Sequence, residues 1–321
     1  MLSDKQKISI YQRMCQIRKF ENRISENFRK GDIPGFVHLS VGQEGVSVGS
    51  CAALSEGDCL LTTHRGHGDL LAKGADINLL AAELYGKETG LNKGRGGSLH
   101  ISDMAHTSIG ANGIVGGGLP IAVGAALAQK FNNKGAVTIC FFGDGAVNQG
   151  TFHESLNLAS VWQVPVIFVC ANNLYGGTTK FDYVSAVTDI ASRATSYAIP
   201  AEKIDGNDVE LVYETVFKAV ENARKGGGPS LIECLTYRWK GHTEGEEAWG
   251  LTYRPDDEIA AWKKNDPILR FEEKLLAEGL LNENQVAGFK NEAQQQVEAA
   301  IDFAKQSASP DPETALDYLF A

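Results

Sequence analysis

The chain has 321 residues, of which 40 are acidic and 30 basic, so its formal net charge is −10 at pH 7. A negative protein resists non-specific binding to nucleic acid and to anionic membranes, and we expect neither as a partner. No run of about 18 apolar residues is present, and the amino terminus has no apolar stretch followed by a cleavage site. The sequence therefore predicts a cytoplasmic protein that does not cross a membrane.

The six cysteines also indicate a reducing compartment. They lie in apolar runs or show no paired spacing, so we expect reduced thiols rather than disulfides. They are Cys15, Cys51, Cys59, Cys140, Cys170 and Cys234.

The first predicted element is an amphipathic helix from Asp4 to about Lys30. Apolar residues recur along it at spacings of three and four, which places them on one face. They are Ile8, Tyr11, Met14, Ile17, Phe20 and Ile24. We expect this arm to pack on the core or on a partner.

Two further helices are predicted at residues 43–54 and 119–131. The second is rich in small residues, with Gly124 and Ala128 four apart on one face. Small residues let another backbone approach closely. Tight packing within the chain and a subunit interface both explain this pattern.

A strand-helix-strand unit follows. Residues 137–142 and 166–170 are continuous apolar stretches of strand length, typical of buried parallel strands. Between them, residues 148–162 carry apolar side chains at helical spacing. A Gly143-Asp144-Gly145 turn ends the first strand, and the pair Asn172-Asn173 ends the second.

These two signals predict a site for a diphosphate and a magnesium ion. Ligands of parallel sheets bind beyond the carboxyl ends of the strands. Glycine lets the backbone approach a diphosphate, and Asp144 and Asn173 offer the oxygen ligands that Mg²⁺ prefers.

The rest of the chain continues the alternation of helix and strand. A turn at 205–208, a helix at 209–225 and a buried strand at 230–235 are expected, and beyond Pro255 the chain is charged and helical. We predict one α/β domain, residues 1–321, built on a doubly wound parallel sheet. It has a helical arm (about 1–30), a core (about 31–255) and a helical tail (about 256–321).

Two other sites are disfavoured by their context. The glycines from Gly110 to Gly118 could suggest a nucleotide fingerprint, but no strand is expected before Gly110 and no acidic residue follows at the required spacing of about 20. His64 and His67 could suggest zinc, but no cysteine or carboxylate nearby completes a set of three or four ligands.

Six motifs in order resemble a known family, the α subunits of the first component of 2-oxo acid and acetoin dehydrogenase complexes. The resemblance covers nearly the whole length. The motifs are GFVHL (35–39), THRGH (63–67), KGRGGS (93–98), GANGIVG (110–116), GDGAVNQG (143–150) and YRWKGH (237–242). Their GDG turn and asparagine pair are similar to the signature of thiamine diphosphate enzymes, so the resemblance implies that cofactor, Mg²⁺ and the thiamine diphosphate-binding fold.

The resemblance also implies which residues hold the cofactor. Asp144, Asn173 and the carbonyl of Tyr175 would bind the metal. Arg65 would bind phosphate oxygens through its planar guanidinium. The implied cofactor contacts are Phe36, His38, His64, Arg65, Gly113, Val115, Gly143, Asp144, Gly145, Ala146, Asn173, Tyr175, Gly176 and His242.

His242 and His64 are the implied catalytic residues. His242 lies in a polar, glycine-rich segment that we expect to be a mobile surface loop, with Glu244, Glu246 and Glu247 disfavouring burial. It would orient the reacting group or transfer protons near neutral pH. His64 stands where many relatives carry tyrosine.

The implied function is the α subunit of a lipoamide-linked acetoin or pyruvate dehydrogenase, with acetoin favoured. Branched-chain or other 2-oxo acid dehydrogenases and a non-catalytic paralogue are the alternatives. The resemblance implies two partners, a β subunit that carries the pyrimidine-binding domain with its activating glutamate, and a lipoyl acyltransferase. Gly176 and Gly177 depart from the Ser/Thr-Pro pair of many relatives, which leaves the specificity of that segment open.

Overall fold

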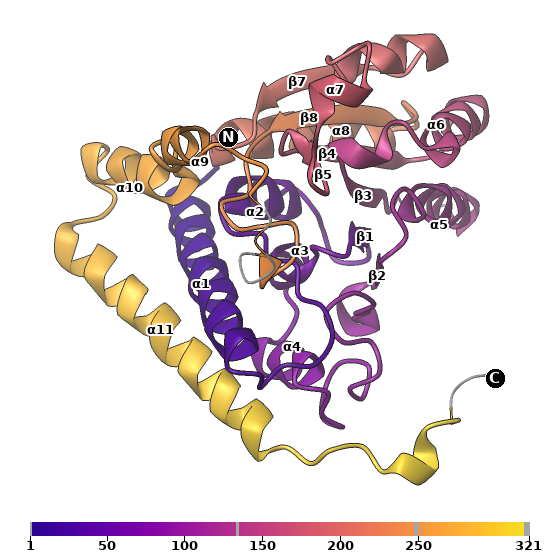
Figure 1. Cartoon of the computed structure of the whole chain (residues 1–321). Coiled ribbons are helices and arrows are strands. Elements are labelled where there is room, and N and C mark those ends of the chain that lie inside the picture. The colour runs from indigo at the N-terminus through magenta and orange to yellow at the C-terminus, as the bar shows by residue number, and fades with distance from the viewer. Residues whose placement is uncertain (1, 133–134, 247–249, 251, 318–321) are drawn as a thin grey trace.

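A six-stranded parallel sheet forms the centre of the computed structural model, which describes residues 2–132, 135–246, 250 and 252–317. The strand order is β2-β1-β3-β4-β8-β7, and every pairing in it is parallel (Figure 1). The strands are β1 (Cys59–Thr63), β2 (Ser108–Asn112), β3 (Thr138–Gly143), β4 (Val166–Asn172), β7 (Ala201–Asp205) and β8 (Ser230–Leu235). A separate antiparallel pair joins β5 (Tyr175–Gly176) to β6 (Thr179–Lys180).

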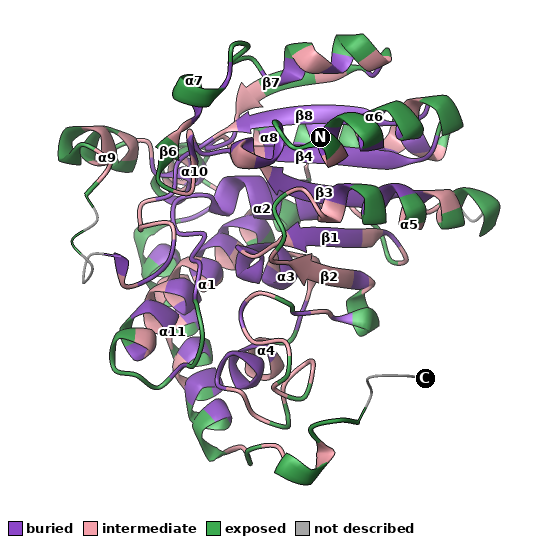
Figure 2. Ribbon diagram, turned by 45° about the vertical axis from the view of Figure 1, so that its right-hand side comes forward, coloured by how far each residue is buried: buried purple, intermediate pink, exposed green. Residues whose placement is uncertain are grey.

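Helices cover both faces of this sheet, as a doubly wound fold requires. Along β3, Ile139 and Phe141 face one apolar core while Cys140 and Phe142 face the other. The strands β3, β4 and β8 are buried between the helical layers, whereas the edge strands β2 and β7 are partly exposed (Figure 2).

The larger core packs against α1 (Asp4–Arg29), α2 (Glu44–Ala52), α3 (His67–Lys73), α4 (Ile77–Leu84) and α8 (Val209–Arg224). It also includes α10 (Pro267–Ala277) and α11 (Glu283–Gln306). The smaller core packs against α5 (Gly118–Asn132), α6 (Gly150–Trp162) and the 3-10 segment η3 (Ala191–Tyr197). Short elements complete the described chain: η1 (Met104–His106), η2 (Asp144–Ala146), α7 (Phe181–Val184), α9 (Asp256–Lys263) and η5 (Pro312–Thr314).

The predicted helical arm and tail are confirmed. Helix α1 begins at a capping box formed by Ser3 and Gln6, and its apolar face is buried. Helix α11 packs along α1 and α4, so the arm and the tail cover the same side of the sheet (Figure 1).

Three strands of the six-stranded sheet were not predicted from the sequence, nor were the short strands β5 and β6. The three are β1, β2 and β7, of which β2 and β7 form the two edges of the sheet. The expectation that no strand would precede the glycine cluster was wrong in detail, because Gly110 lies inside β2. The glycines that follow β2, at positions 113, 116, 117 and 118, do not have the G-x-G-x-x-G spacing of a nucleotide fingerprint, so that alternative remains unsupported.

Nothing in the described part of the chain packs on the small-residue face of α5. Gly124 has nothing within 4 Å of the position where a Cβ would stand, and both Gly124 and Ala128 are exposed. Tight packing inside the chain is therefore wrong for this face. A subunit interface stays a prediction.

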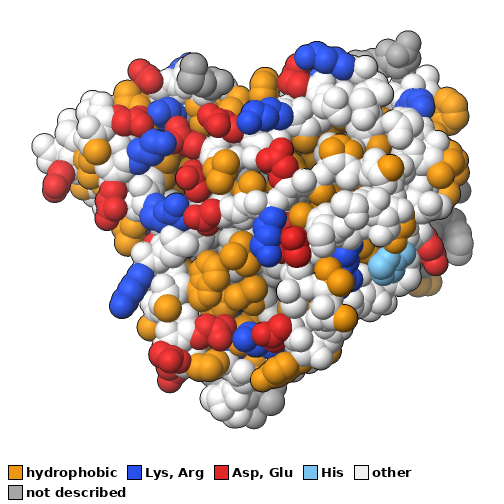
Figure 3. Space-filling model, turned by 90° about the horizontal axis from the view of Figure 1, so that it is seen from above, with side chains coloured by type: hydrophobic (Ala, Val, Ile, Leu, Met, Phe, Trp, Pro, Cys, Tyr) orange, Lys and Arg blue, Asp and Glu red, His pale blue; other side chains and the backbone are white. Residues whose placement is uncertain are grey.

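Other features agree with the composition. The six cysteines are free thiols, of which five are buried and Cys59 is half-buried. No helix among the described residues is long and apolar enough to span a membrane. Seen from above, charged side chains of both signs are intermixed on the surface (Figure 3).

Candidate active site

A cavity of about 450 Å³ lies beyond the carboxyl ends of β1, β3 and β4. This is the edge of a parallel sheet where ligands are expected. It brings together most of the predicted site residues. Those that line it are His64, Arg65, Val115, Gly143, Asp144, Gly145, Ala146, Asn173, Tyr175, Gly176 and His242.

Asp144 is the buried carboxylate of this cavity, at the turn that follows β3. Its Oδ1 accepts a hydrogen bond from the backbone N–H of Asn173 at 3.2 Å. Its Oδ2 is buried and has no hydrogen-bond partner among the described residues. Burial raises the pKa of Asp144 to about 6, although the nearby backbone N–H groups oppose that rise. An unpartnered buried carboxylate oxygen calls for a proton or a cation.

Asn173 follows β4 and lies beside Asp144. Its side-chain amide donates to Oε1 of Gln43 at 3.2 Å, and its Oδ1 accepts from the backbone N–H of Tyr175 at 3.3 Å. Leu174, between Asn173 and Tyr175, has a φ of 72°. A bulky residue rarely adopts this left-handed conformation, so the turn is held by its surroundings.

The two turns approach each other at Gly145 and Gly176. A Cβ on either residue would stand 3.1 Å from the Cα of the other. Such a contact is tighter than most Cβ contacts, so a side chain at either position would push the two turns slightly apart. The departure from the family at Gly176 thus has a structural reason here.

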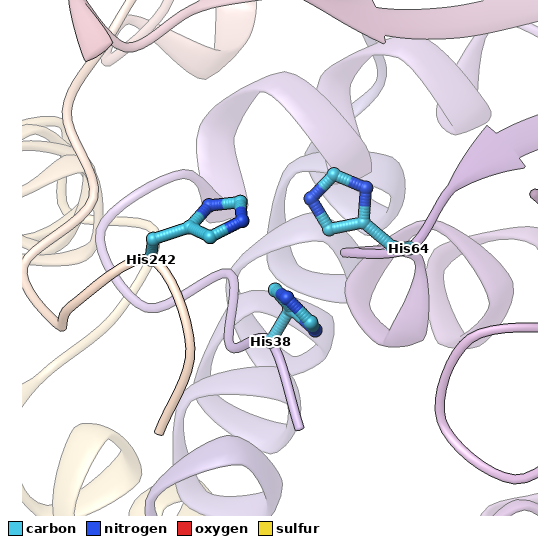
Figure 4. A group of neighbouring side chains, drawn as sticks. All are labelled: His38, His64 and His242. Carbon is cyan, nitrogen blue, oxygen red and sulfur yellow. The ribbon is translucent and has the colours of Figure 1, made fainter. Parts of the chain in front are cut away.

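Three histidines from separate segments come together at the cavity wall. The ring centroids of His38 and His64 are 4.6 Å apart, those of His38 and His242 are 4.9 Å apart, and those of His64 and His242 are 5.4 Å apart. In Figure 4 the rings of His242 and His64 point toward one another, with His38 beside the gap. His64 and His242 line the cavity, while His38 is buried behind them.

Burial and a neighbouring cation favour the neutral form of all three imidazoles. Burial, followed by the charge of Arg65, lowers the pKa of His38 to about 2 and those of His64 and His242 to about 3. Proton transfer by His242 near neutral pH stays a prediction, and the buried guanidinium of Arg65 beside the ring disfavours an imidazolium there.

Arg65 is the cation that, after burial, lowers the pKa values of the three histidines. Its guanidinium is buried and donates to the carbonyl of Leu39 at 2.7 Å and to the carbonyl of His242 at 3.0 Å. These bonds tie the segment before α2 to the segment after β8. The same side chain also reaches Nδ1 of His242 at 3.3 Å.

The segment that carries His242 differs from the mobile surface loop expected. Glu244 and Glu246 are each only 4% exposed. Glu244 accepts from Ser25 at 2.9 Å and pairs with Arg29. Glu246 accepts from the backbone N–H of His242 at 2.7 Å and from that of Thr243 at 3.1 Å. Paired and hydrogen-bonded carboxylates can be buried, which the charge pattern alone did not reveal. Glu247 lies outside the described residues.

The structure does not bring every predicted residue to the cavity. Phe36 is 59% exposed and is not among the lining residues, nor is Gly113, although Ile114 and Val115 are. The disfavoured zinc pair is separated, because His67 is buried between Glu21 and Ser98. The structure instead groups His38, His64 and His242, whose nearest ligand atoms all lie within 4.8 Å of one another.

Several cavity residues were missed from the sequence. Asp69 accepts from the hydroxyls of Ser47 and Thr62 at 2.5 Å, and burial raises its pKa to about 6. The position of Asp69 right after the THRGH motif was the signal that could have found it. Gln43 could be found only through its contact with Asn173.

Arg238 is a second buried cation that was missed. It is fully buried and donates to the carbonyl of Gly177, while its Nε and Nη1 have no partner among the described residues. Burial lowers its pKa below the usual range. Its place inside the YRWKGH motif was the available signal.

Comparison with known proteins agrees with this geometry. Residues 12–313 match the family described as Dehydrogenase E1 component. The α subunit of acetoin:2,6-dichlorophenolindophenol oxidoreductase from Bacillus subtilis (strain 168) is 47% identical over 310 residues, or 96% of this chain and 92% of that protein. Its counterpart from Cupriavidus necator is 44% identical over the same shares of the two chains.

A pyruvate dehydrogenase subunit is also similar. The E1 component α subunit from Rhizobium meliloti (strain 1021) is 38% identical over 305 residues, or 95% of this chain and 87% of that protein. The chain therefore belongs to the dehydrogenase E1 component family, as an α subunit of the thiamine diphosphate-dependent 2-oxo acid and acetoin dehydrogenase class.

Proposed function

We propose that the cavity holds thiamine diphosphate through a Mg²⁺ ion bound by Asp144, Asn173 and the carbonyl of Tyr175. The observation that carries this is the buried Oδ2 of Asp144, which has no hydrogen-bond partner among the described residues. The donor set fits the ion, because carboxylate, amide and carbonyl oxygens are the ligands of Mg²⁺. The diphosphate would supply further oxygens.

The residues around this position suit an anionic ligand. Gly143, Gly145 and Gly176 leave room for close approach of the backbone. Arg65 supplies positive charge in the cavity wall, and Arg238 supplies a further buried positive charge near Asp144. Val115 and Ile114 offer an apolar surface beside them. When bound, the cofactor provides an electron sink for cleavage of a bond next to a carbonyl.

The histidines would act on the substrate side of the cavity. His242 and His64 line it as neutral imidazoles, so each can donate or accept a hydrogen bond without adding charge. His38, Phe36, Gly113 and Ala146 complete the proposed cofactor surroundings by resemblance.

The active enzyme would form with a β subunit that contributes the pyrimidine-binding domain and its activating glutamate. The acyl group would pass to a lipoyl acyltransferase. We favour acetoin as substrate, because the two acetoin oxidoreductase subunits are 47% and 44% identical to this chain and the pyruvate dehydrogenase subunit is 38% identical. Acetoin and lipoamide would then give acetaldehyde and S-acetyldihydrolipoamide.

Turnover by the reconstituted αβ complex tests this proposal. The rate of 2,6-dichlorophenolindophenol reduction is measured with acetoin, pyruvate and a branched-chain 2-oxo acid as alternative substrates. We expect acetoin to have the highest kcat/KM and the activity to require the β chain. A higher kcat/KM for pyruvate or a branched-chain acid would overturn the substrate, and activity of the α chain alone would overturn the need for a partner.

A further inference from the structure

His242 is held at its backbone on both sides. Its N–H donates to Oε2 of Glu246 at 2.7 Å and to the hydroxyl of Tyr253 at 3.0 Å. Its carbonyl accepts from Nη2 of Arg65 at 3.0 Å. These contacts fix the position from which the imidazole enters the cavity.

The ring is held as well, by the same arginine. Nη2 of Arg65 lies 3.3 Å from Nδ1 of His242. A guanidinium has only N–H donors and does not lose its proton in proteins, so Arg65 can be nothing but the donor of this bond. Nδ1 of His242 must therefore be the acceptor and carry no proton.

The position of the remaining proton follows from the charge of the ring. A neutral imidazole has one N–H, and if Nδ1 is the acceptor, that N–H is on Nε2. The ring is kept neutral by burial and by the charges of Arg65 and Arg238. Nε2 is the nitrogen farther from the backbone, at the end of the ring that points toward His64 (Figure 4).

We propose that Arg65 is a positioning residue that holds His242 as its Nε2–H tautomer, so that His242 presents a hydrogen-bond donor to an oxygen atom of the bound substrate. The inference rests on the proposed function, since it assigns the role of His242 in that reaction. A neutral imidazole does not readily give up this proton, so the role is hydrogen bonding to an oxygen that gains negative charge, with no proton transfer.

The same bond explains why three clustered histidines need not form a metal site. A metal ion takes the lone pair of a neutral imidazole. The lone pair of His242 is on Nδ1, where it accepts from Arg65, and Nε2 carries the proton, so neither nitrogen is open to a metal ion in this arrangement. Only His38 and His64 remain, and two ligands are fewer than the three or four that zinc sites use.

Two isosteric variants test the donor in the reconstituted holoenzyme. The amide nitrogen of glutamine can stand where Nε2 of histidine was, and that of asparagine can stand where Nδ1 was. We expect His242→Gln to keep at least about tenfold more kcat than His242→Asn, since loss of such a donor typically costs about 10²- to 10³-fold. Equal activity, or more activity in His242→Asn, would overturn the proposal.

A spectroscopic measurement tests the tautomer without relying on turnover. In the complex labelled with ¹⁵N-histidine, the signals of His242 are identified by their loss in His242→Gln. We expect Nε2 protonated and Nδ1 unprotonated in the wild type, and a mixture of tautomers in Arg65→Lys, whose single ammonium lacks the planar fork. Arg224→Lys, which alters a distant arginine paired with Asp58, should leave the signals unchanged.

A wild-type His242 protonated on Nδ1, or an Arg65→Lys spectrum identical to the wild type, would overturn the role of Arg65. These outcomes are distinct from failure of the proposed function. If neither acetoin nor any 2-oxo acid is turned over, that function fails while the tautomer assignment still stands or falls on the spectrum.

Discussion

The pKa of Asp144 is raised because its carboxyl group is buried and one of its oxygens has no hydrogen-bond donor among the described residues. Its Oδ2 has no hydrogen-bond donor among the described residues, and burial raises its pKa from 3.8 to about 6. A raised pKa means that the folded state holds the proton more tightly than the unfolded chain does. The carboxylate therefore costs stability at neutral pH until a cation neutralises it.

This cost predicts a pH-dependent effect of Asp144→Asn in the cofactor-free protein. Between pH 3.8, the pKa of Asp144 in the unfolded chain, and about pH 6, its pKa in the folded protein, the wild type loses stability as the pH rises. The Asp144→Asn variant has no carboxyl group at this position and does not show this loss. Relative to wild type, the variant should gain about 1 kcal/mol of unfolding free energy between pH 5 and pH 7.5. Urea unfolding of both proteins without metal at the two pH values measures this gain in unfolding free energy. The pKa of Asp69 is also raised, but its effect is the same in both proteins and cancels. A difference that does not change with pH would contradict the raised pKa.

At the scale of elements, the segment 240–246 is a loop fixed by buried carboxylates. Glu246 accepts from two backbone N–H groups, and Glu244 reaches back to Ser25 of α1. The loop is therefore attached to the arm and to the cavity wall at once. This gives Glu246 a role in placing His242.

We predict that Glu246→Ala loosens this loop. The buried N–H of Thr243 would lose its acceptor, at a cost of about 1–3 kcal/mol if nothing replaces it, and the N–H of His242 would keep only the hydroxyl of Tyr253. Hydrogen–deuterium exchange should accelerate in a peptide covering 240–246, and Glu246→Gln, which keeps one acceptor oxygen, should show a smaller change. Glu56→Ala, at an exposed glutamate, is the control. Unchanged exchange in Glu246→Ala would mean that the loop is held by its other contacts.

The elements differ in how strongly the sequence specifies them. The buried strands β3, β4 and β8 are continuous apolar runs and were predicted, as were α1, α5 and α6 from their helical spacing. The strands β1, β2 and β7 each contain partly exposed residues, and none of them is a continuous apolar run. The sequence therefore did not predict them.

The candidate site also has one part that the sequence specifies locally and one part that it does not. The GDG turn and the asparagine pair are local signals at strand ends, and the sequence alone is enough to locate the cavity from them. The burial of Glu244 and Glu246, the ring contacts of the three histidines and the role of Gln43 depend on segments far apart in the sequence. No local pattern specifies such contacts.

At the scale of the whole molecule, helix α5 has an exposed face that packs against nothing in the described part of the chain. Gly124 and Ala128 are exposed, and the neighbouring Ile121 and Phe131 are 47% and 79% exposed. Exposed apolar and small residues on one helix face are suited to close packing with another subunit. That the whole chain forms a single domain also stays a prediction.

We predict that Gly124→Leu leaves the α chain folded and blocks assembly with the β subunit. A leucine at this position meets open space within the chain, so circular dichroism and the melting temperature should be unchanged or slightly improved. Sedimentation of the mixed subunits should show loss of the complex. Gly288→Leu, at an equally open glycine on α11, should assemble normally. Normal assembly of Gly124→Leu would show that this face is not the interface.

The central claim is that thiamine diphosphate is held through a divalent cation on Asp144. Calorimetric titration of the cofactor into the reconstituted αβ complex, with and without Mg²⁺, tests it most directly in wild type and Asp144→Ala. The account predicts that wild-type affinity depends on Mg²⁺, and that Asp144→Ala loses both the Mg²⁺ dependence and most of the affinity while the complex stays assembled. Equal, Mg²⁺-dependent affinity in the two proteins would contradict it.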